Sequence, residues 1–282
     1  MIILESFRNI FAVPDLRKRV LFTFGLLAIY RVGAHIPTPG LDAQALEEFF
    51  KASAGGLLGF LDMFSGGALR RLSVFALGIT PYITASIILQ LLTVVWPYLE
   101  KLSKEGEMGR RKITQYTRYG TVVLSVVQGA GIALWLWGSS TPTGKFLVLR
   151  DPTSESGKLA FVLMAILTLT TGTAFVMWLG EQMTERGIGN GISLIIFAGI
   201  VVGLPTAVWQ MFRQIQRGQM SLFTALLLTV FMLGVVGIIV FVERAQRRIP
   251  VQYAKRVVGR RVYGGQNTYL PLRVNTGGVI PI

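Results

Sequence analysis

Residues 55–96 read GGLLGFLDMFSGGALRRLSVFALGITPYITASIILQLLTVVW, and this stretch decides the fold. A short apolar segment with a glycine pair near each end, residues 55–67, precedes a longer apolar run at residues 72–96. A helix made of the short segment would reach about 20 Å, which is less than the hydrocarbon core of a bilayer at about 30 Å. The short segment therefore cannot span a membrane, whereas the longer run can.

The two pieces also differ in how favourably they would enter a bilayer. The large apolar side chains of the short segment are Leu57, Leu58, Phe60, Leu61 and Phe64. Together they contribute about −2 kcal/mol to membrane insertion, which Asp62 at about +3 kcal/mol would cancel at bilayer depth. The longer run has no charged residue. The stretch thus predicts a weakly anchored, movable element, hinged on glycines, beside a firm span.

Composition assigns the whole chain to the membrane. Its 282 residues are 52% hydrophobic and 15% charged, whereas soluble domains have about a quarter charged residues. Cysteine is absent, which excludes disulfides, zinc thiolate sites and a thiol nucleophile. The single histidine, His35, precedes a Pro-Thr-Pro-Gly turn and is expected to be structural. We therefore predict a polytopic membrane protein without a metal site or a cofactor.

Six apolar runs have close to the length of about 20 residues that a membrane-spanning helix needs. They are residues 20–36, 72–96, 119–137, 159–179, 188–209 and 221–242, and the last five have no Lys, Arg, Asp or Glu. Arg31 is expected to snorkel near the outer end of the first span, and Pro81 to kink the second. Residues 276–282 resemble the start of a seventh span that is cut short.

The basic residues predict the orientation of these spans. Residues 1–19, 97–118, 180–187 and 243–275 would share one side of the membrane, and they hold 19 of the 28 basic residues. By the positive-inside rule that side is cytoplasmic, so the N-terminus is inside and residues 55–67 lie toward the exterior. The predicted domains are an amphipathic segment at residues 1–19, a membrane domain at 20–242, a basic loop at 243–275 and the truncated span.

The last five spans contain no Lys, Arg, Asp or Glu. This argues against coupled transport, because ion- and proton-coupled transporters need ionisable groups in the membrane. A passive conduit with an apolar constriction remains possible, since rings of branched apolar side chains can seal a pore by dewetting. Ile79 and Ile83 are four residues apart and share one helical face. The alternative is that this stripe only contacts lipid or neighbouring helices.

Two cytoplasmic segments have distinctive patterns. In the basic loop, residues 257–274 predict a hairpin around Gly264 and Gly265, whose Arg260 and Arg261 suit phosphates or acidic protein surfaces. The alternative is that this charge only keeps the loop inside. The glycine-rich residues 181–194 lack a preceding strand and a Gly-Lys-Ser/Thr ending, so they predict a tight turn capped by Asn190 rather than a phosphate site.

Several long motifs in order resemble the bacterial SecY family, the channel subunit of the Sec protein translocon. They are FLDMFSGGALRRLSVFALGITPYITASIILQLLTVV, EKLSKEGEMGRRKITQYTRYGT, MWLGEQMTERGIGNGISLIIFAGIV and ERAQRRIPVQYAKRVVGRRVYGGQNTYLPLRVNTGGVIPI. Only residues 138–157 depart from the family pattern. The resemblance implies an all-α fold of ten spans in two halves, of which this chain has six and the start of a seventh, half to two-thirds of the fold.

The resemblance also implies roles for individual residues. A re-entrant plug helix would comprise Gly55, Gly56, Leu57, Leu58, Phe60, Leu61, Asp62, Met63, Phe64, Gly66 and Gly67. The pore ring would include Ile79, Ile83, Ile196 and Val279. The cytoplasmic hairpin would dock the ribosome, through its rRNA, and the SecA motor with Arg256, Arg260 and Arg261. The span after the plug would form part of a lateral gate.

On this reading the chain is not an enzyme, and it lies in the bacterial cytoplasmic (inner) membrane. It would pass unfolded secretory proteins with signal sequences across the bilayer and release membrane segments sideways, with SecE and SecG as partner subunits. Energy would come from SecA or the ribosome. The alternatives are a small-solute channel or transporter, or a non-conducting membrane scaffold.

Overall fold

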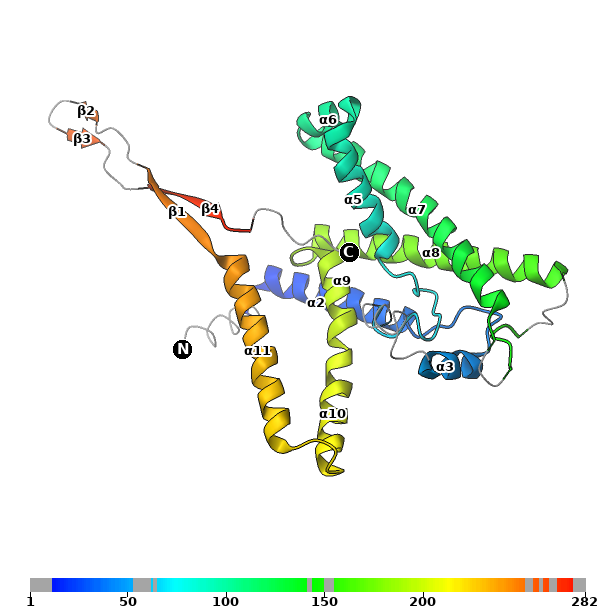
Figure 1. Ribbon diagram of the computed structural model, residues 1–282. Helices are drawn as coiled ribbons and strands as arrows, with labels where there is room; N and C mark the ends of the chain where they lie inside the picture. The colour runs from blue at the N-terminus through cyan, green and yellow to red at the C-terminus, as the bar shows by residue number, and fades with distance from the viewer. Residues whose placement is uncertain are drawn as a thin grey trace. The chain divides into compact units, whose positions relative to one another are not determined.

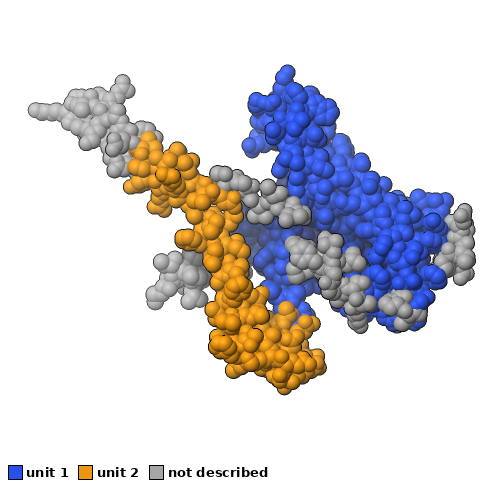
Figure 2. Space-filling model, viewed as in Figure 1, with its two compact units in different colours: residues 1–206 blue, residues 207–282 orange. Residues whose placement is uncertain are grey.

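The computed structural model describes residues 12–52, 62, 65–140, 144–149, 155–251, 256–258, 261–263 and 268–275. It is mostly helical and divides into two compact units, residues 1–206 and 207–282 (Figures 1 and 2). The helices of the first unit are α2 (Pro14–Gly33), α3 (Ala43–Ala52), α5 (Thr80–Val95), α6 (Pro97–Lys104), α7 (Glu107–Gly138), α8 (Glu155–Arg186) and α9 (Gly191–Val201). The division falls within α10 (Gly203–Gln216).

Most of the predicted spans have a matching helix. Within the described part of the chain, four helical stretches are long and apolar enough to cross a membrane: Glu107–Gly138, Gly157–Arg186, Gly191–Gln216 and Leu222–Arg244. They match the last four predicted spans. The pair α5 and α6, bent by 100°, makes a fifth if it is counted as one span. Residues 20–33 of the first predicted span lie in α2, and residues 34–36 follow its end; α2 also includes Asp15 and the basic residues Arg17, Lys18 and Arg19.

The prediction of one helix across residues 72–96 is wrong. Residues 66–79 form successive turns, with positive φ at Leu72 (39°) and Gly78 (54°), and α5 begins only at Thr80. The predicted kink at Pro81 is also wrong, because Pro81 lies in the first turn of α5, where its missing N–H breaks no helical hydrogen bond.

Residues 36–38 satisfy the backbone of this turn segment in place of helical hydrogen bonds. The Thr38 Oγ1 and N–H both donate to the Leu72 carbonyl, at 2.7 and 2.9 Å. The Val74 N–H donates to the Ile36 carbonyl at 2.9 Å. These bonds give the Leu72 carbonyl and the Val74 N–H the partners that a helix would otherwise supply.

Two glycines allow the turn segment to lie against neighbouring helices. A Cβ on Gly172 of α8 would overlap the Val74 carbonyl, and a Cβ on Gly33 of α2 would overlap the Phe75 ring. In the same unit α7 packs along α8 and against α5, and α2 contacts α8 and α9. The turn segment is thus fixed between α2 and α8.

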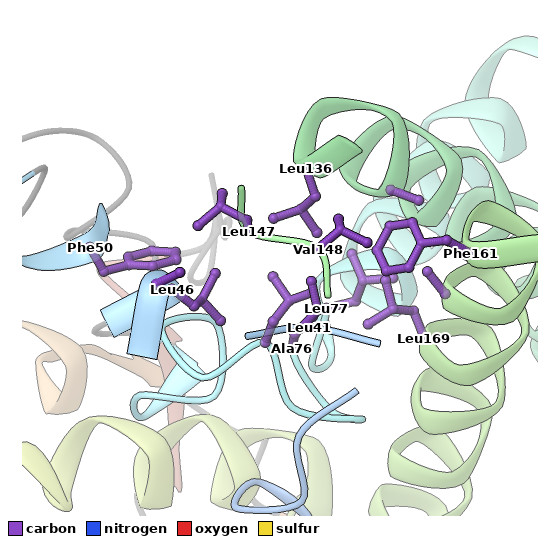
Figure 3. Close-up of a cluster of buried hydrophobic side chains, with 14 residues drawn as sticks. Leu41, Leu46, Phe50, Ala76, Leu77, Leu136, Leu147, Val148, Phe161 and Leu169 are labelled. Atoms are coloured by element: carbon purple, nitrogen blue, oxygen red, sulfur yellow. The ribbon is translucent and has the colours of Figure 1, made fainter. Parts of the chain in front are cut away.

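An apolar core lies where α3 meets the turn segment, α7 and α8 (Figure 3). Its larger buried members are Leu41, Leu46, Phe50, Leu72, Leu77, Leu136, Leu147, Val148, Phe161 and Leu169. The sequence analysis did not predict α3, whose first turn is capped by Asp42 through the Gln44 N–H at 2.9 Å. Leu147 is fully buried, and its carbonyl accepts the Asp42 N–H at 3.0 Å. The atypical residues 138–157 therefore contribute part of a core.

The second unit contains α11 (Leu222–Arg244) and the four strands found in the described residues, β1 (Gln246–Val251), β2 (Arg256–Val258), β3 (Arg261–Tyr263) and β4 (Thr268–Arg273). β1 pairs antiparallel with β4, and β2 pairs antiparallel with β3. Val258 is opposite Arg261 in this hairpin. The residues of the predicted turn, Gly264 and Gly265, lie outside the described residues. The paired ribbon begins earlier than predicted, at Gln246.

Candidate functional site

An apolar cluster forms where α2, the turn segment, α5, α8 and α9 meet, and we call it the Ile79 cluster. Its buried members are Leu26, Tyr30, Phe75, Ile79, Val176, Leu179, Met183 and Ile195. Phe22, Leu27, Val74, Ile83, Ile192 and Ile196 pack against them and are partly buried. No ionisable side chain other than the Tyr30 phenol belongs to the cluster among the described residues.

The structure brings three of the four predicted ring residues into this one cluster. Ile79 immediately precedes α5 and is 6% exposed, and Ile83 follows one helical turn later. Ile196 joins them from α9, more than a hundred positions further along the chain. Val279 lies outside the described residues. Branched apolar side chains from two separate helices thus meet, which is the chemistry that a dewetted constriction requires.

A column of aromatic rings supports Ile79 and was not foreseen from the sequence. Tyr30 of α2 stacks on Phe75 with ring centroids 5.9 Å apart. Phe75 stacks in turn on Phe175 of α8 at 5.9 Å, and Phe175 on Trp178 at 5.7 Å. Phe75 is four residues before Ile79, so the column fixes the backbone from which Ile79 projects.

Hydrogen bonds between helix ends position α9 and hence Ile196. The Asn190 Oδ1 accepts the N–H groups of Ile192 and Ser193 at 3.0 and 3.4 Å, which confirms the predicted cap. The Thr184 Oγ1 of α8 accepts the Gly191 N–H at 2.9 Å. The α8–α9 turn is also held on α2, because Thr23 Oγ1 accepts the Ile188 N–H at 3.3 Å.

The described end of the predicted plug, residue 62 with residues 65–67, forms a tight turn. Of the predicted plug residues, Asp62, Gly66 and Gly67 are described, and the others lie outside the described residues. The Asp62 carbonyl accepts the Gly67 N–H at 3.1 Å and the Ser65 hydroxyl at 2.9 Å. The Asp62 Oδ1 accepts the Arg70 N–H at 2.7 Å. Asp62 therefore closes this turn, and it was predicted only as a charge unfavourable to membrane insertion.

The turn meets both α2 and α9 at Gly66. The Arg31 Nη1 donates to the Gly66 carbonyl at 2.8 Å, across 35 positions of sequence. Gly66 has φ +65°, and a Cβ there would lie 2.9 Å from the Gly199 carbonyl oxygen of α9. Arg31 was predicted to snorkel near the outer end of the first span, and its side chain hydrogen-bonds to this turn.

Two cavities flank this turn. One of about 440 Å³ is lined by residues that include His35, Glu47, Asp62, Arg70 and Arg71. The other, of about 250 Å³, is lined by residues that include Arg31, Asp62, Gly199 and Thr206. The described residues hold no cluster of three His, Cys, Asp or Glu side chains that could bind a metal ion.

The predicted docking residues lie on the ribbon of the second unit. Arg256 is in β2 opposite Tyr263, and Arg261 is in β3 opposite Val258, while Arg260 lies outside the described residues. Arg247 and Arg248 of β1 and Arg273 of β4 are exposed. The ribbon therefore has arginines at its base, on β1 and β4, and at its tip, on β2 and β3. The sequence analysis singled out only the arginines of the tip.

Known proteins resemble this chain in sequence. The family model named SecY matches residues 73–282. The protein translocase subunit SecY of Escherichia coli strain K12 is 53% identical over 267 residues, which cover 95% of this chain and 58% of that protein. The SecY of Streptomyces coelicolor is 50% identical over 283 residues, covering 99% of this chain and 64% of the relative. The chain thus spans about three-fifths of the length of these relatives.

Solved structures resemble it in fold. A protein-conducting channel matches with a TM-score of 0.58 at 18% identity, covering 91% of this chain and 52% of that structure. Sec61 in a canine ribosome–channel complex matches with a TM-score of 0.55 at 17% identity, covering 83% of this chain and 49% of that structure. The predicted fold class, a partial channel fold of membrane-spanning helices, is confirmed.

Proposed function

This chain belongs to the SecY family, and we propose that it supplies one half of a protein-conducting channel in a membrane. In the complete channel, unfolded secretory chains cross the bilayer, and apolar segments leave sideways into the membrane. They leave past α5, which forms one wall of a lateral gate. The observation that carries this proposal is the Ile79 cluster, in which Ile79, Ile83 and Ile196 come together from separate helices. The role is passive, and the energy comes from a bound motor or ribosome.

The cluster suits a seal around a moving polypeptide. Branched apolar side chains exclude water when a pore is empty, and they offer no fixed hydrogen bonds that would bind one particular sequence. In this proposal Val279 adds a fourth member to the ring. Ile83 and Ile196 are only partly buried, so their surfaces remain available for ring members that follow in the complete protein and for a passing chain.

The plug assignment rests on residues 55–67 being too short and too polar to span the bilayer. Their described end, residue 62 with residues 65–67, contacts α2 and α9, and both helices contribute to the Ile79 cluster. In this role the segment covers the constriction on the exterior side and moves away when a chain enters. Glycine pairs at both ends permit that movement.

The distribution of basic residues along the chain supports an orientation in the membrane and a set of partners. Because basic residues concentrate in residues 1–19, 97–118 and 243–275, we place these segments in the cytoplasm and the chain in the bacterial inner membrane. The domain limits at residues 19, 242 and 275 belong to this proposal. The basic ribbon then faces the ribosome or SecA, with Arg256, Arg260 and Arg261 as contacts. SecE and SecG would complete the channel.

Site-directed crosslinking tests the proposal. The chain contains no cysteine, so a single Ile83→Cys or Ile196→Cys change in the full-length protein gives one reactive thiol. A secretory chain stalled during translocation should crosslink to either position. Ile88→Cys is the matched control, because Ile88 lies on the same helix, is 44% exposed and is outside the cluster. If the Ile83→Cys protein crosslinks to the stalled chain no more strongly than the Ile88→Cys protein does, the proposal is wrong.

A further inference from the structure

We propose that Arg31 is a positioning residue that holds the turn at residues 65–67 against α9 and so keeps the empty channel closed. This inference rests on the proposed function and adds a specific contact to it. Its basis is the hydrogen bond from the Arg31 Nη1 to the Gly66 carbonyl, at 2.8 Å. Arg31 lies in the last turn of α2, next to Tyr30, whose ring stacks on Phe75 in the Ile79 cluster.

The contact fixes a point where no side chain fits. Gly66 approaches the backbone of Gly199 so closely that a Cβ would lie 2.9 Å from its carbonyl oxygen and 3.0 Å from its Cα. The same Cβ would lie 3.3 Å from the Arg31 Nη1. Arg31 and Gly199 therefore meet the turn at the same residue, and the guanidinium holds Gly66 in place from the α2 side.

Hydrogen bonds join Asp62 to residues 65–70, so these residues respond to this contact together. The Gly67 N–H, the Ser65 hydroxyl and the Arg70 N–H all bond to Asp62. The Ser65 Oγ also accepts the Leu69 N–H at 3.0 Å. Holding Gly66 consequently holds the whole turn, and the turn continues into the segment that places Phe75 and Ile79.

Little else joins this turn to α2. Among the described residues, the Arg31 bond is the one hydrogen bond between α2 and residues 62–67. Cavities of about 440 and 250 Å³ border the turn, and Asp62 and Gly67 line both of them. With open volume beside it, the turn can move once the Arg31 contact is lost. A charge-assisted hydrogen bond is strong enough to shift the balance between two such positions.

Ion conductance without a secretory chain tests the inference. The full-length protein with its partner subunits is reconstituted in planar bilayers as wild type, Arg31→Met, Arg31→Lys and Arg71→Met. Arg71 is the matched control, since it carries the same charge and lines the larger cavity, whereas the side-chain hydrogen bond to Gly66 comes from Arg31. We expect Arg31→Met to raise the resting conductance about tenfold, Arg31→Lys to raise it less, and Arg71→Met to leave it unchanged.

Hydrogen exchange of residues 62–70 supplies a second readout. Arg31→Met should speed exchange of the Gly67 amide about tenfold and leave the amides of α2 unchanged. Equal conductance and equal exchange in Arg31→Met and Arg71→Met would overturn the inference. If the wild type passes no secretory chain, the proposed function fails, and the Arg31 contact is then judged by exchange alone.

Discussion

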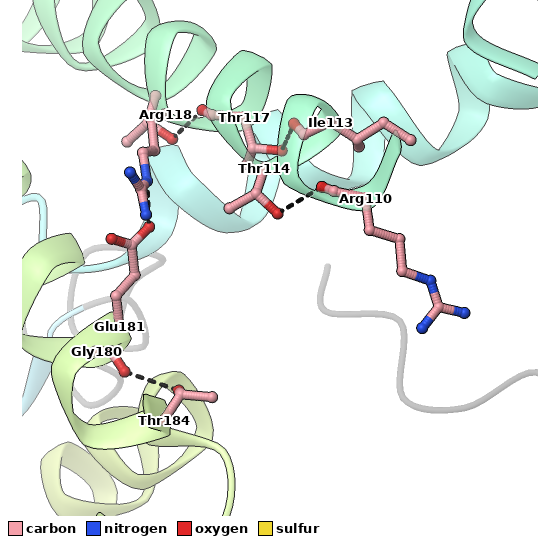
Figure 4. Close-up of polar contacts among 9 residues, drawn as sticks. Arg110, Ile113, Thr114, Thr117, Arg118, Gly180, Glu181 and Thr184 are labelled. Carbon is pink, nitrogen blue, oxygen red and sulfur yellow. Dashed lines mark hydrogen bonds and ion pairs between the residues drawn. The ribbon is translucent and has the colours of Figure 1, made fainter. Parts of the chain in front are cut away.

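The Arg118 Nε of α7 donates to the Glu181 Oε1 of α8 at 2.7 Å and joins two helices across 63 positions of sequence (Figure 4). The Glu181 side chain is only 16% exposed, and the Arg118 side chain is 43% exposed. Glu181 follows Gly180, whose carbonyl accepts the Thr184 hydroxyl at 2.8 Å. The ion pair therefore links α7 to the end of α8 that leads into α9 and Ile196.

Arg118→Met should destabilise the folded protein by about 2 kcal/mol, because it leaves a largely buried carboxylate without its counter-ion. Adding Glu181→Met should recover part of this loss, since the unpaired charge is then gone. Thermal unfolding in detergent, followed by tryptophan fluorescence, measures both variants.

The ion pair between Lys104 and Glu100 is the control, with nearly the same distance, 2.6 Å, but 74% and 49% exposed side chains. Lys104→Met should leave the unfolding midpoint unchanged, because exposed pairs contribute little. Equal effects at Arg118 and Lys104 would contradict the role given to burial.

The sequence was sufficient for the later spans and insufficient for the segment before α5. α8 and α11 follow from long runs without charge, and Asn190 was predicted as the cap before α9. Residues 72–79 have no charged residue, like a membrane-spanning helix, but hydropathy measures transfer to lipid and not backbone conformation. Their turns depend on hydrogen bonds to Ile36 and Thr38, which are distant in sequence.

The site was predictable to a similar extent. Spacing pointed to Ile79 and Ile83, whereas Ile196 entered through the family resemblance, because no periodicity links α5 to α9. The aromatic support of Phe75 and the partner of Arg31 arise only when distant segments pack together. In the ribbon, the glycine pair predicted a hairpin, but the register that pairs Val258 with Arg261 depends on contacts between strands and could not be read from the glycines.

Gly172→Ala should severely destabilise the first unit. The added Cβ would overlap the Val74 carbonyl, and moving that backbone would cost about 3 kcal/mol or more. Gly25→Ala in α2 is the matched change, because a Cβ there meets nothing within 4 Å. It should be neutral or stabilise by about 1 kcal/mol through helix propensity. The midpoints of thermal unfolding of the two variants test this difference. A Gly172→Ala protein as stable as the wild type would show that the turn segment does not lie against α8.

Gly66→Ala and Gly67→Ala separate backbone strain from close packing. Both residues have positive φ, 65° and 83°, so each alanine should cost about 1–2 kcal/mol in strain. Only the Gly66 variant also places a Cβ against Gly199, whereas a Cβ on Gly67 meets nothing within 4 Å. Gly66→Ala should therefore speed hydrogen exchange across residues 62–70 by more than Gly67→Ala. Matching exchange rates would argue against the close approach of the turn to α9.

The basic ribbon should bind its cytoplasmic partner through its tip. Arg260→Glu with Arg261→Glu should weaken binding of ribosomes or SecA about tenfold at physiological salt and reduce the salt dependence of that binding. Arg247→Glu with Arg248→Glu makes the same charge change on β1, where both side chains are exposed, at the base of the ribbon. If both pairs weaken binding equally, general positive charge is sufficient. A loss confined to the tip, with unchanged unfolding of the membrane helices, identifies residues 260–261 as the docking site.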